Sequence, residues 1–218
     1  MDNNNALIIF TRLPIGSETK TRLAPVLTEA ERADLHIAMW NNIFKSVIDF
    51  NAINACDVYL YWTGSGNVSD YAHYIPPQFI LREQCQGSLG DRMRDAMSEV
   101  FASGRYAKVC LIGCDIPGLK AVNLVHAFDM LDYNDAVIAP TFDGGYWLIG
   151  MSKFINKAFD APPCDWGNAD VFNWTLAHIK SLGLSCACLD ADRLLDIDTP
   201  EDLERLTGIY IKDGTFKV

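Results

Sequence analysis

Residues 108–117 read KVCLIGCDIP, an apolar run that ends in a single carboxylate, Asp115. A short apolar run bounded by turn residues predicts a buried strand from Lys108 to Gly113. Asp115 then lies just past the carboxyl end of the strand, where α/β sheets bind their ligands. We therefore expect Asp115 to be a metal ligand at that edge, because a nucleotide-bound divalent cation needs only one or two protein carboxylates. The alternative is an aspartate that merely forms the turn before proline.

Strands and helices alternate on both sides of this stretch. In the clearest helix, from about residue 28 to 50, Thr28 and Glu31 form a capping box and apolar residues recur at helical spacing. The alternation predicts an α/β fold with a mostly parallel sheet that is covered by helices on both faces. The expected strands cover residues 6–11, 57–62, 79–82, 108–113, 136–140, 146–151 and 185–189, and the other helices begin near residues 90, 122, 171 and 199.

The length and the net charge of the chain limit the number of domains and the kinds of partner that we expect. A chain of 218 residues fits one domain, spanning residues 1–218, with a full core. Its net charge of −10 argues against nucleic acid and anionic membranes as partners. The first residues lack the basic start of a signal peptide, and no run approaches the roughly 20 apolar residues of a membrane span. We expect a cytoplasmic protein.

The seven cysteines are odd in number and form no CxxC motif. Most fall in apolar, strand-like segments, which is typical of buried reduced thiols. Metal binding by two of them is the less favoured interpretation, because no histidine stands at ligand spacing.

The loop after the first strand concentrates positive charge in an otherwise acidic chain. Arg12, Lys20 and Arg22 stand close together there, with Gly16 between them. Such a loop can aim backbone amides and cations at a phosphate, although the Gly-Lys-Ser/Thr of a P-loop is absent. We predict that these four residues contact substrate; considered alone, a solvated basic loop is the favoured alternative.

Residues 196–199 read DIDT, a string that also occurs in phosphatases of the haloacid dehalogenase type. Its position excludes that chemistry, because too little chain follows to carry the other motifs of such an enzyme. A second metal ligand fits better, with Asp198 favoured over Asp196. The alternative is that one aspartate only begins the terminal helix.

A glycine-containing turn at residues 143–147, DGGYW, is a second candidate substrate contact. Gly144 and Gly145 allow close backbone approach, and Tyr146 offers a stacking face for a sugar or base. Asp143 carries a carboxylate into the same turn. A hairpin turn followed by core aromatics explains the segment equally well.

Gln86, Gly87 and Gly90 precede and open the helix near residue 90. Their amide and exposed backbone could read a base edge, or they could form only a helix entry. The histidines are expected to be structural, because none lies near these loops in sequence and no Ser-His-Asp or Cys-His arrangement is apparent. They are His36, His73, His126 and His178.

Five ordered motifs together resemble one family, the uncharacterised glycosyltransferase-like family known as domain of unknown function 2064, within the nucleotide-diphospho-sugar transferase superfamily. The resemblance covers residues 6–206. The motifs are Phe10-Thr11-Arg12-x-Pro14-x-Gly16-x-x-x-Lys20-Thr21-Arg22-Leu23, Leu89-Gly90-Asp91-Arg92-Met93, Gly113-Cys114-Asp115-x-Pro117, Asp143-Gly144-Gly145-Tyr146-Trp147-Leu148-Ile149-Gly150 and Asp196-x-Asp198-Thr199-Pro200-Glu201-Asp202-Leu203.

The resemblance implies a three-layer α/β/α fold of the GT-A type with a mostly parallel, mixed sheet. It further implies that Arg12, Lys20 and Arg22 contact phosphates, that residues 86–90 lie near the base, and that Asp115 and Asp198 hold Mg²⁺ or Mn²⁺. Molybdenum-cofactor guanylyltransferases and phospholactate guanylyltransferases share several of these motifs. The usual Asp-x-Asp of glycosyltransferases is reduced here to Asp115.

The favoured function is a metal-dependent transferase with a nucleotide-sugar donor, in which Lys20 neutralises the leaving diphosphate and Asp143 is the base for a small-molecule or sugar acceptor. The alternative is a nucleotidyltransferase that joins a nucleoside triphosphate to a small phosphorylated acceptor and releases pyrophosphate. A third hypothesis is a non-catalytic nucleotide-binding protein. The base, the group transferred and the oligomeric state cannot be inferred from the sequence.

Overall fold

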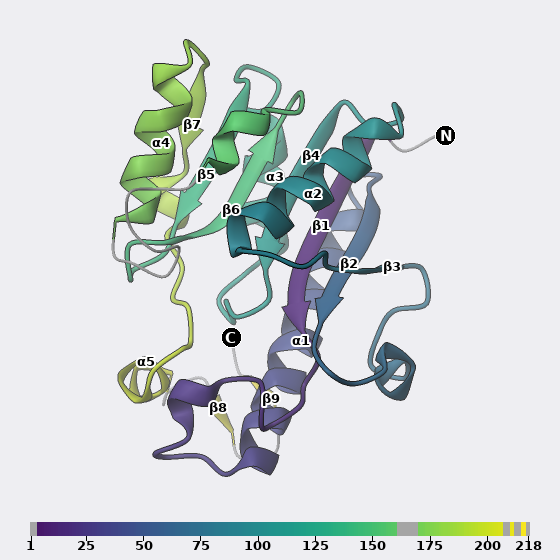
Figure 1. Ribbon diagram of the computed structural model, residues 1–218, viewed down its shortest axis with the longest axis vertical. Coiled ribbons are helices and arrows are strands. Elements are labelled where there is room, and N and C mark those ends of the chain that lie inside the picture. The colour runs from purple at the N-terminus through teal and green to yellow at the C-terminus, as the bar shows by residue number, and fades with distance from the viewer. Residues whose placement is uncertain (1–3, 161–169, 207–209, 212–214, 217–218) are drawn as a thin grey trace.

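The computed structural model describes residues 4–160, 170–206, 210–211 and 215–216. Seven strands form one mixed sheet in the order β3-β2-β1-β4-β6-β5-β7 (Figure 1). Only β6 runs antiparallel to its neighbours β4 and β5; the other pairs are parallel. The bounds are β1 Asn5–Arg12, β2 Asp57–Thr63, β3 Ile80–Glu83, β4 Lys108–Gly113, β5 Ala136–Pro140, β6 Tyr146–Met151 and β7 Cys186–Cys188.

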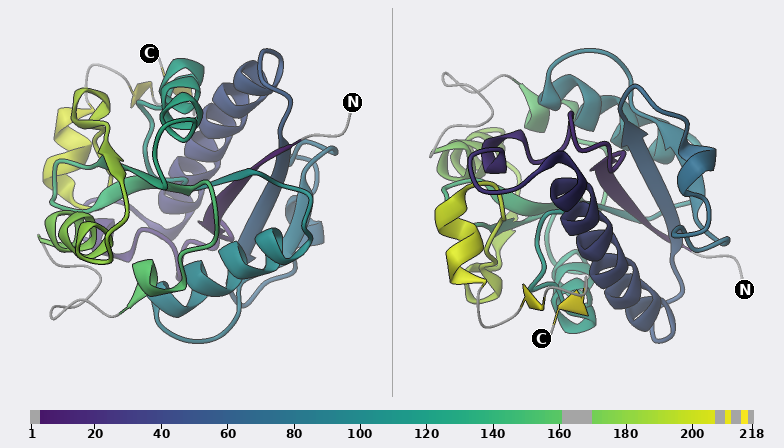
Figure 2. Two further views of the ribbon diagram at one scale, coloured as in Figure 1. Left: turned by 90° about the horizontal axis from the view of Figure 1, so that it is seen from above. Right: turned by 90° about the horizontal axis from the view of Figure 1, so that it is seen from below.

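Helices cover both faces of this sheet, which gives three layers (Figures 1 and 2). One face packs against α1 and α3, and the other packs against α2, α4 and the short helix η3. The alternation of side chains along β1 explains the two faces: Leu7 and Ile9 belong to the first core, Ala6 and Ile8 to the second. The helices are α1 Glu29–Asn51, α2 Leu89–Ala102, α3 Ala121–Met130, α4 Val171–Ser181 and α5 Pro200–Arg205.

The helix starts follow local capping. Thr28 and Glu31 form the predicted capping box of α1, and Ser88 with Asp91 forms another at the start of α2. Thr199 caps α5, with proline in its first turn. The remaining elements are the 3-10 helices η1 Thr21–Leu23, η2 Val68–Tyr71, η3 Asn156–Phe159 and η4 Asp190–Asp192, and the short strands β8 Tyr210–Ile211 and β9 Thr215–Phe216.

The α/β class, the mixed and mostly parallel sheet and the helices on both faces are confirmed. Strands β5 and β6 pair as an antiparallel hairpin, so the turn at residues 143–147 does reverse the chain. No helix within the described residues is long and apolar enough to cross a bilayer. Among the cysteines, Cys56, Cys110 and Cys114 are buried thiols, burial raises their pKa, and Cys164 lies outside the described residues.

Candidate functional site

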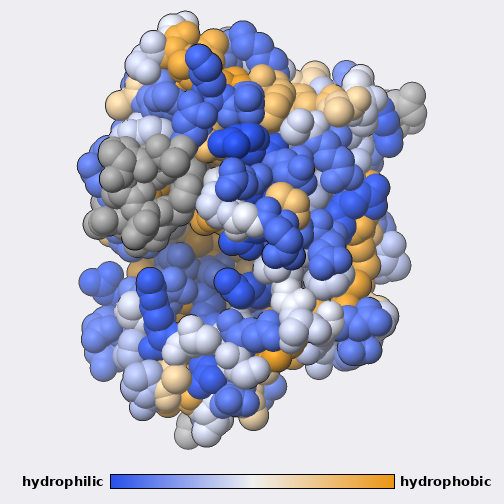
Figure 3. Space-filling view, viewed as in Figure 1, coloured by the Kyte–Doolittle hydropathy of each residue, from blue (hydrophilic) through white to orange (hydrophobic). Residues whose placement is uncertain are grey.

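A cavity of about 430 Å³ opens beyond the carboxyl ends of β1 and β4. Its walls come from the loop after β1, the start of α2 and the segment before α5. Figure 3 shows this side of the molecule, hollowed between the sheet and the lower part of the chain, with mainly hydrophilic surface around the opening. Five of the predicted site residues line it. They are the two predicted metal ligands, Asp115 and Asp198, and the three cations predicted to contact phosphates, Arg12, Lys20 and Arg22.

Lys20 lines this cavity. Its side chain is 2% exposed, and its Nζ lies 3.1 Å from an oxygen of Asp115 and 3.1 Å from one of Asp198. It also donates to the backbone oxygen of Ile197 at 2.5 Å. Burial alone would lower the pKa of Lys20, but the carboxylates of Asp115, Asp196 and Asp198 outweigh it and raise the pKa above its usual value. The ammonium is therefore fully charged at neutral pH.

The backbone of Lys20 is left-handed, with φ 50° and ψ 39°. It is the only non-glycine residue with positive φ within the described part of the chain. Such a conformation costs a non-glycine residue about 1 kcal/mol or more and persists only where the surroundings enforce it. Here the left-handed turn directs the amine of Lys20 towards the carboxylates of Asp115 and Asp198.

Three carboxylates converge on this amine: Asp115, Asp196 and Asp198 each offer an oxygen within 4.8 Å of the others. The backbone amide of Ile197 donates to the backbone oxygen of Asp115 at 3.0 Å, which holds the segment before α5 against the end of β4. Asp196 was the less favoured aspartate of the DIDT string, yet it lies beside the other two.

Asp196 has a buried oxygen, Oδ1, with no hydrogen-bond partner among the described residues. Burial and then the charge of Asp115 raise the pKa of Asp196 well above its usual range, whereas Lys20 lowers the pKa of Asp115 despite its burial. An unpaired buried carboxylate oxygen beside two other carboxylates is the donor set of a hard divalent cation such as Mg²⁺ or Mn²⁺. The residues present therefore fit such an ion.

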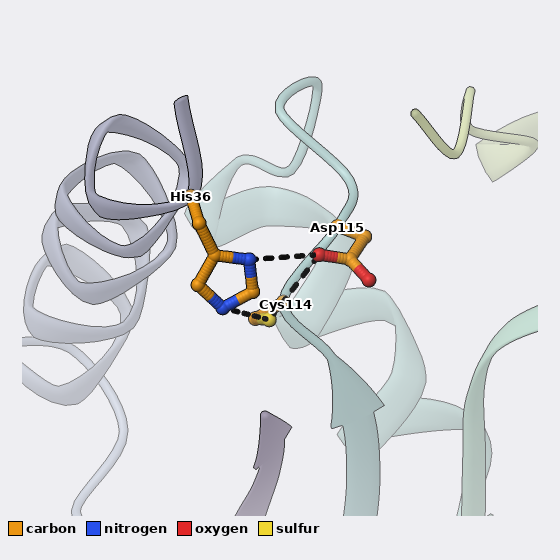
Figure 4. Close-up of side chains that lie close together, drawn as sticks. All are labelled: His36, Cys114 and Asp115. Atoms are coloured by element: carbon orange, nitrogen blue, oxygen red, sulfur yellow. Dashed lines mark hydrogen bonds and ion pairs between the residues drawn. The ribbon is translucent and has the colours of Figure 1, made fainter. Parts of the chain in front are cut away.

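His36 lies against this cluster in the fold, although it is not near the site loops in sequence. Figure 4 shows its ring reaching from α1 to Cys114 and Asp115 at the end of β4. One nitrogen, Nε2, is 3.0 Å from the backbone oxygen of Arg12, and the other is 2.9 Å from the hydroxyl of Thr19. The carbonyl only accepts, so Nε2 donates and Nδ1 accepts.

Burial lowers the pKa of His36 to about 4, so the ring is neutral at pH 7. Helical periodicity could have predicted that His36 lies on the inner face of α1, next to Leu35. It could not have predicted which residues the ring contacts. Its role is to fix the loop that carries Arg12 and Lys20.

A further cation, Arg92 of α2, lines the same cavity. It donates to the side-chain oxygen of Gln84 at 2.7 Å, while its buried Nε has no partner among the described residues. Gln84 in turn donates to the backbone oxygens of Thr11 and Tyr61. Burial, together with the nearby positive charge of Arg12, lowers the pKa of Arg92. Two arginines that repel each other beside a cavity form a site for an anion.

Five of the predicted substrate contacts lie outside the linings of both described cavities: Gly16, Gln86, Gly87, Gly90 and Gly144. Gly16 packs against the start of α1, where an added Cβ would lie 1.9 Å from the backbone oxygen of Glu29. Gly90 is buried within α2, and Gln86 is exposed. Their substrate contacts stay predictions, and the glutamine that does line the nucleotide-sized cavity is Gln84.

A second cavity, of about 290 Å³, adjoins the first, and five residues line both: Phe10, Arg22, Leu89, Gly113 and Asp198. Asp143, Gly145 and Tyr146 line it, as does Asp196. Gly144 is outside this lining but has φ 94°, which favours glycine, and its carbonyl accepts from Phe172 of α4. The carboxylate cluster thus stands between two connected cavities.

Comparison with known proteins shows the family of the chain. A family described as "Uncharacterized protein conserved in bacteria (DUF2064)" matches residues 47–168. The chain belongs to the DUF2064 family. This confirms the resemblance inferred from the five motifs.

Relatives of this DUF2064 protein extend over most of its length. A 2-phospho-L-lactate guanylyltransferase of Methanosphaera stadtmanae is 29% identical, with 89% of this chain and 82% of the relative covered. A 3-phospho-D-glycerate guanylyltransferase of Phenylobacterium zucineum is 28% identical, with 86% and 83% covered.

Solved structures agree on the fold. A protein from Desulfovibrio desulfuricans, described as a nucleotide-diphospho-sugar transferase, has a TM-score of 0.83 and 29% identity, with 94% of this chain and 86% of the other covered. A Mycobacterium tuberculosis protein solved with manganese has a TM-score of 0.55 and 16% identity, with 94% and 98% covered, and shows the fold alone. The DUF2064 chain is therefore an enzyme of the transferase class with the nucleotide-diphospho-sugar transferase fold.

Proposed function

We propose that this protein transfers a nucleotidyl group from a nucleoside triphosphate to a small phosphorylated acceptor and releases pyrophosphate. The observation that carries the proposal is the cluster of Lys20 with Asp115, Asp196 and Asp198, which stands between two connected cavities. One cavity is rich in cations and suits a triphosphate, and the other leaves room for an acceptor. The guanylyltransferase relatives support this reaction over glycosyl transfer.

In this proposal the triphosphate occupies the first cavity. Arg12, Arg22 and Arg92 contact its phosphates, and Lys20 neutralises charge next to the bond that breaks. His36 and Gln84, which also line this cavity, hold the loop after β1 and the guanidinium of Arg92 in place.

Asp115, Asp196 and Asp198 would hold Mg²⁺ or Mn²⁺. When bound, such an ion neutralises phosphate charge and stabilises the leaving pyrophosphate. The unpaired Oδ1 of Asp196 supports this assignment.

The reaction balances without a protein base. A phosphate oxygen of the acceptor forms a bond to the α-phosphorus, the bond from that phosphorus to the β-phosphate oxygen breaks, and pyrophosphate leaves with the electron pair. Phosphate monoesters have a second pKa near 6, so the attacking oxygen is already ionised at neutral pH. Asp143 is then not needed as a base.

Transfer from a nucleotide sugar is the second candidate, supported by the structural neighbour described as a nucleotide-diphospho-sugar transferase. It would use the same cations and carboxylates, but the second cavity would hold the sugar. The two reactions differ in the donor and in the product that leaves.

The test is product analysis by mass spectrometry. The protein with Mn²⁺ is incubated with GTP, ATP, CTP or UTP and a set of phosphorylated acceptors, and in parallel with nucleotide sugars. We expect a nucleoside-diphosphate-linked acceptor from one triphosphate, GTP being the first to examine. Asp115→Asn should abolish the product, and Asp129→Asn, on the exposed side of α3, should not. A glycosylated product from a nucleotide sugar, with no triphosphate consumed, would support the second candidate.

A further inference from the structure

The second cavity has an unusual charge for an acceptor site. Asp196 and Asp198 line it, but they belong to the cluster of Lys20 and the proposed ion, so Asp143 is the carboxylate of the lining outside that cluster; the one cation of the lining within the described residues is Arg22. Arg22 already lies 3.5 Å from Asp198.

We propose that the acceptor carries a phosphate but no second anionic group, so that its tail is neutral, as in a polyol or sugar phosphate. This inference rests on the proposed function. The acceptors named for the two curated relatives, phospholactate and phosphoglycerate, each bear a carboxylate beside the phosphate. A second anionic group in this cavity would lie near Asp143, and the one cation of the described lining, Arg22, already pairs with Asp198.

Asp143 is held in place. Its Oδ1 accepts from the hydroxyl of Thr141 at 2.5 Å and from the backbone amide of Gly145 at 3.0 Å. These two hydrogen bonds hold the exposed carboxylate at the wall of the cavity.

The remaining wall suits a neutral tail. Tyr146, Trp147 and Met93 line it, and the indole nitrogen of Trp147 already donates to the backbone oxygen of Asp192. Apolar and aromatic walls with few polar groups accept the carbon face of a polyol or sugar. Asp143 therefore determines specificity by excluding a second anion, and does not act as a base.

The experiment compares two acceptors of almost the same shape. Glycerol 3-phosphate and 3-phosphoglycerate differ only in a hydroxymethyl group against a carboxylate. The ratio of kcat/KM for the two is measured with GTP and Mn²⁺. We expect the wild type to prefer glycerol 3-phosphate by about ten-fold or more, because a like charge in a partly enclosed cavity is disfavoured by this order.

Asp143→Asn keeps the oxygen that Thr141 and Gly145 bind and removes only the charge. The ratio should then fall towards one, whereas Asp129→Asn, distant from the cavity on α3, should leave it as in the wild type. Equal use of both acceptors by the wild type would overturn the inference. So would an Asp143→Asn variant that loses activity with both acceptors by the same factor, the result expected of a general base.

Absence of transfer to any phosphorylated acceptor would contradict the proposed function instead. The inference is then judged from binding: the two acceptors are titrated by calorimetry into the protein with GTP and Mn²⁺. Tighter binding of glycerol 3-phosphate that Asp143→Asn removes supports it, and equal affinities overturn it.

Discussion

Replacing Lys20 by methionine removes the cation that three carboxylates surround. Loss of one partner from a buried ion pair typically costs about 3–5 kcal/mol. The side chain of Lys20 is 2% exposed, but those of Asp115 and Asp198 are 36% and 43% exposed, so water screens part of the loss. We therefore expect a loss of about 2–3 kcal/mol in the free energy of unfolding. In a protein of this size that corresponds to a fall of about 4–12 °C in Tm.

The assay is thermal unfolding of the metal-free protein, followed by circular dichroism at pH 7, with Lys45→Met as the control. Lys45 is 80% exposed and pairs only with Asp49 on the surface of α1, so its substitution should change stability by no more than about 0.5 kcal/mol. Mn²⁺ should restore part of the stability of Lys20→Met, because a cation then offsets the carboxylates. A Tm equal to that of the wild type, or no response to Mn²⁺, would refute the account of the cluster.

Three other substitutions are informative. Two test the packing around the site, and the third tests a carboxylate elsewhere in the protein. Gly16→Ala should destabilise the protein by about 2 kcal/mol or more, because its Cβ would meet the backbone oxygen of Glu29 at 1.9 Å; Gly118→Ala, whose Cβ has ordinary contacts, is the control in urea denaturation. Gln84→Leu should raise the nucleotide KM about ten-fold through misplacement of a guanidinium, and an unchanged KM would exclude that role. Hydrogen bonds from Lys153 and Ser185 lower the pKa of Asp135 to about 2, so its contribution to stability is present above pH 4 and lost as the pH falls through 2. The difference in urea midpoint between wild type and Asp135→Asn should vanish as the pH falls from 4 to 2. A difference that stays constant with pH would contradict the lowered pKa of Asp135.

Much of the fold could be predicted from local patterns. The apolar run at residues 108–113 became β4, and the capping box at Thr28 became the start of α1. The direction of β6 could not be predicted from its apolar residues, because a buried strand has the same composition in either direction. The turn at residues 143–147 was the only local signal for the hairpin.

The site was predicted in part for a physical reason. Loops that follow parallel strands meet at one edge, so Lys20, Asp115 and Asp198 could be expected together. The sequence does not show which buried atoms lack a hydrogen-bond partner, so Asp198 was favoured over Asp196 as a metal ligand. His36 was missed because its partners belong to a loop that only the packing of α1 brings near.

The most direct test of the central claim is phosphorus NMR of the wild-type protein with GTP, glycerol 3-phosphate and Mg²⁺. We predict that the triphosphate signals give way to pyrophosphate and to a new phosphoanhydride in equal amounts, and that both products depend on the acceptor. Orthophosphate release that is independent of the acceptor, or triphosphate signals that persist with every phosphorylated acceptor, would contradict nucleotidyl transfer.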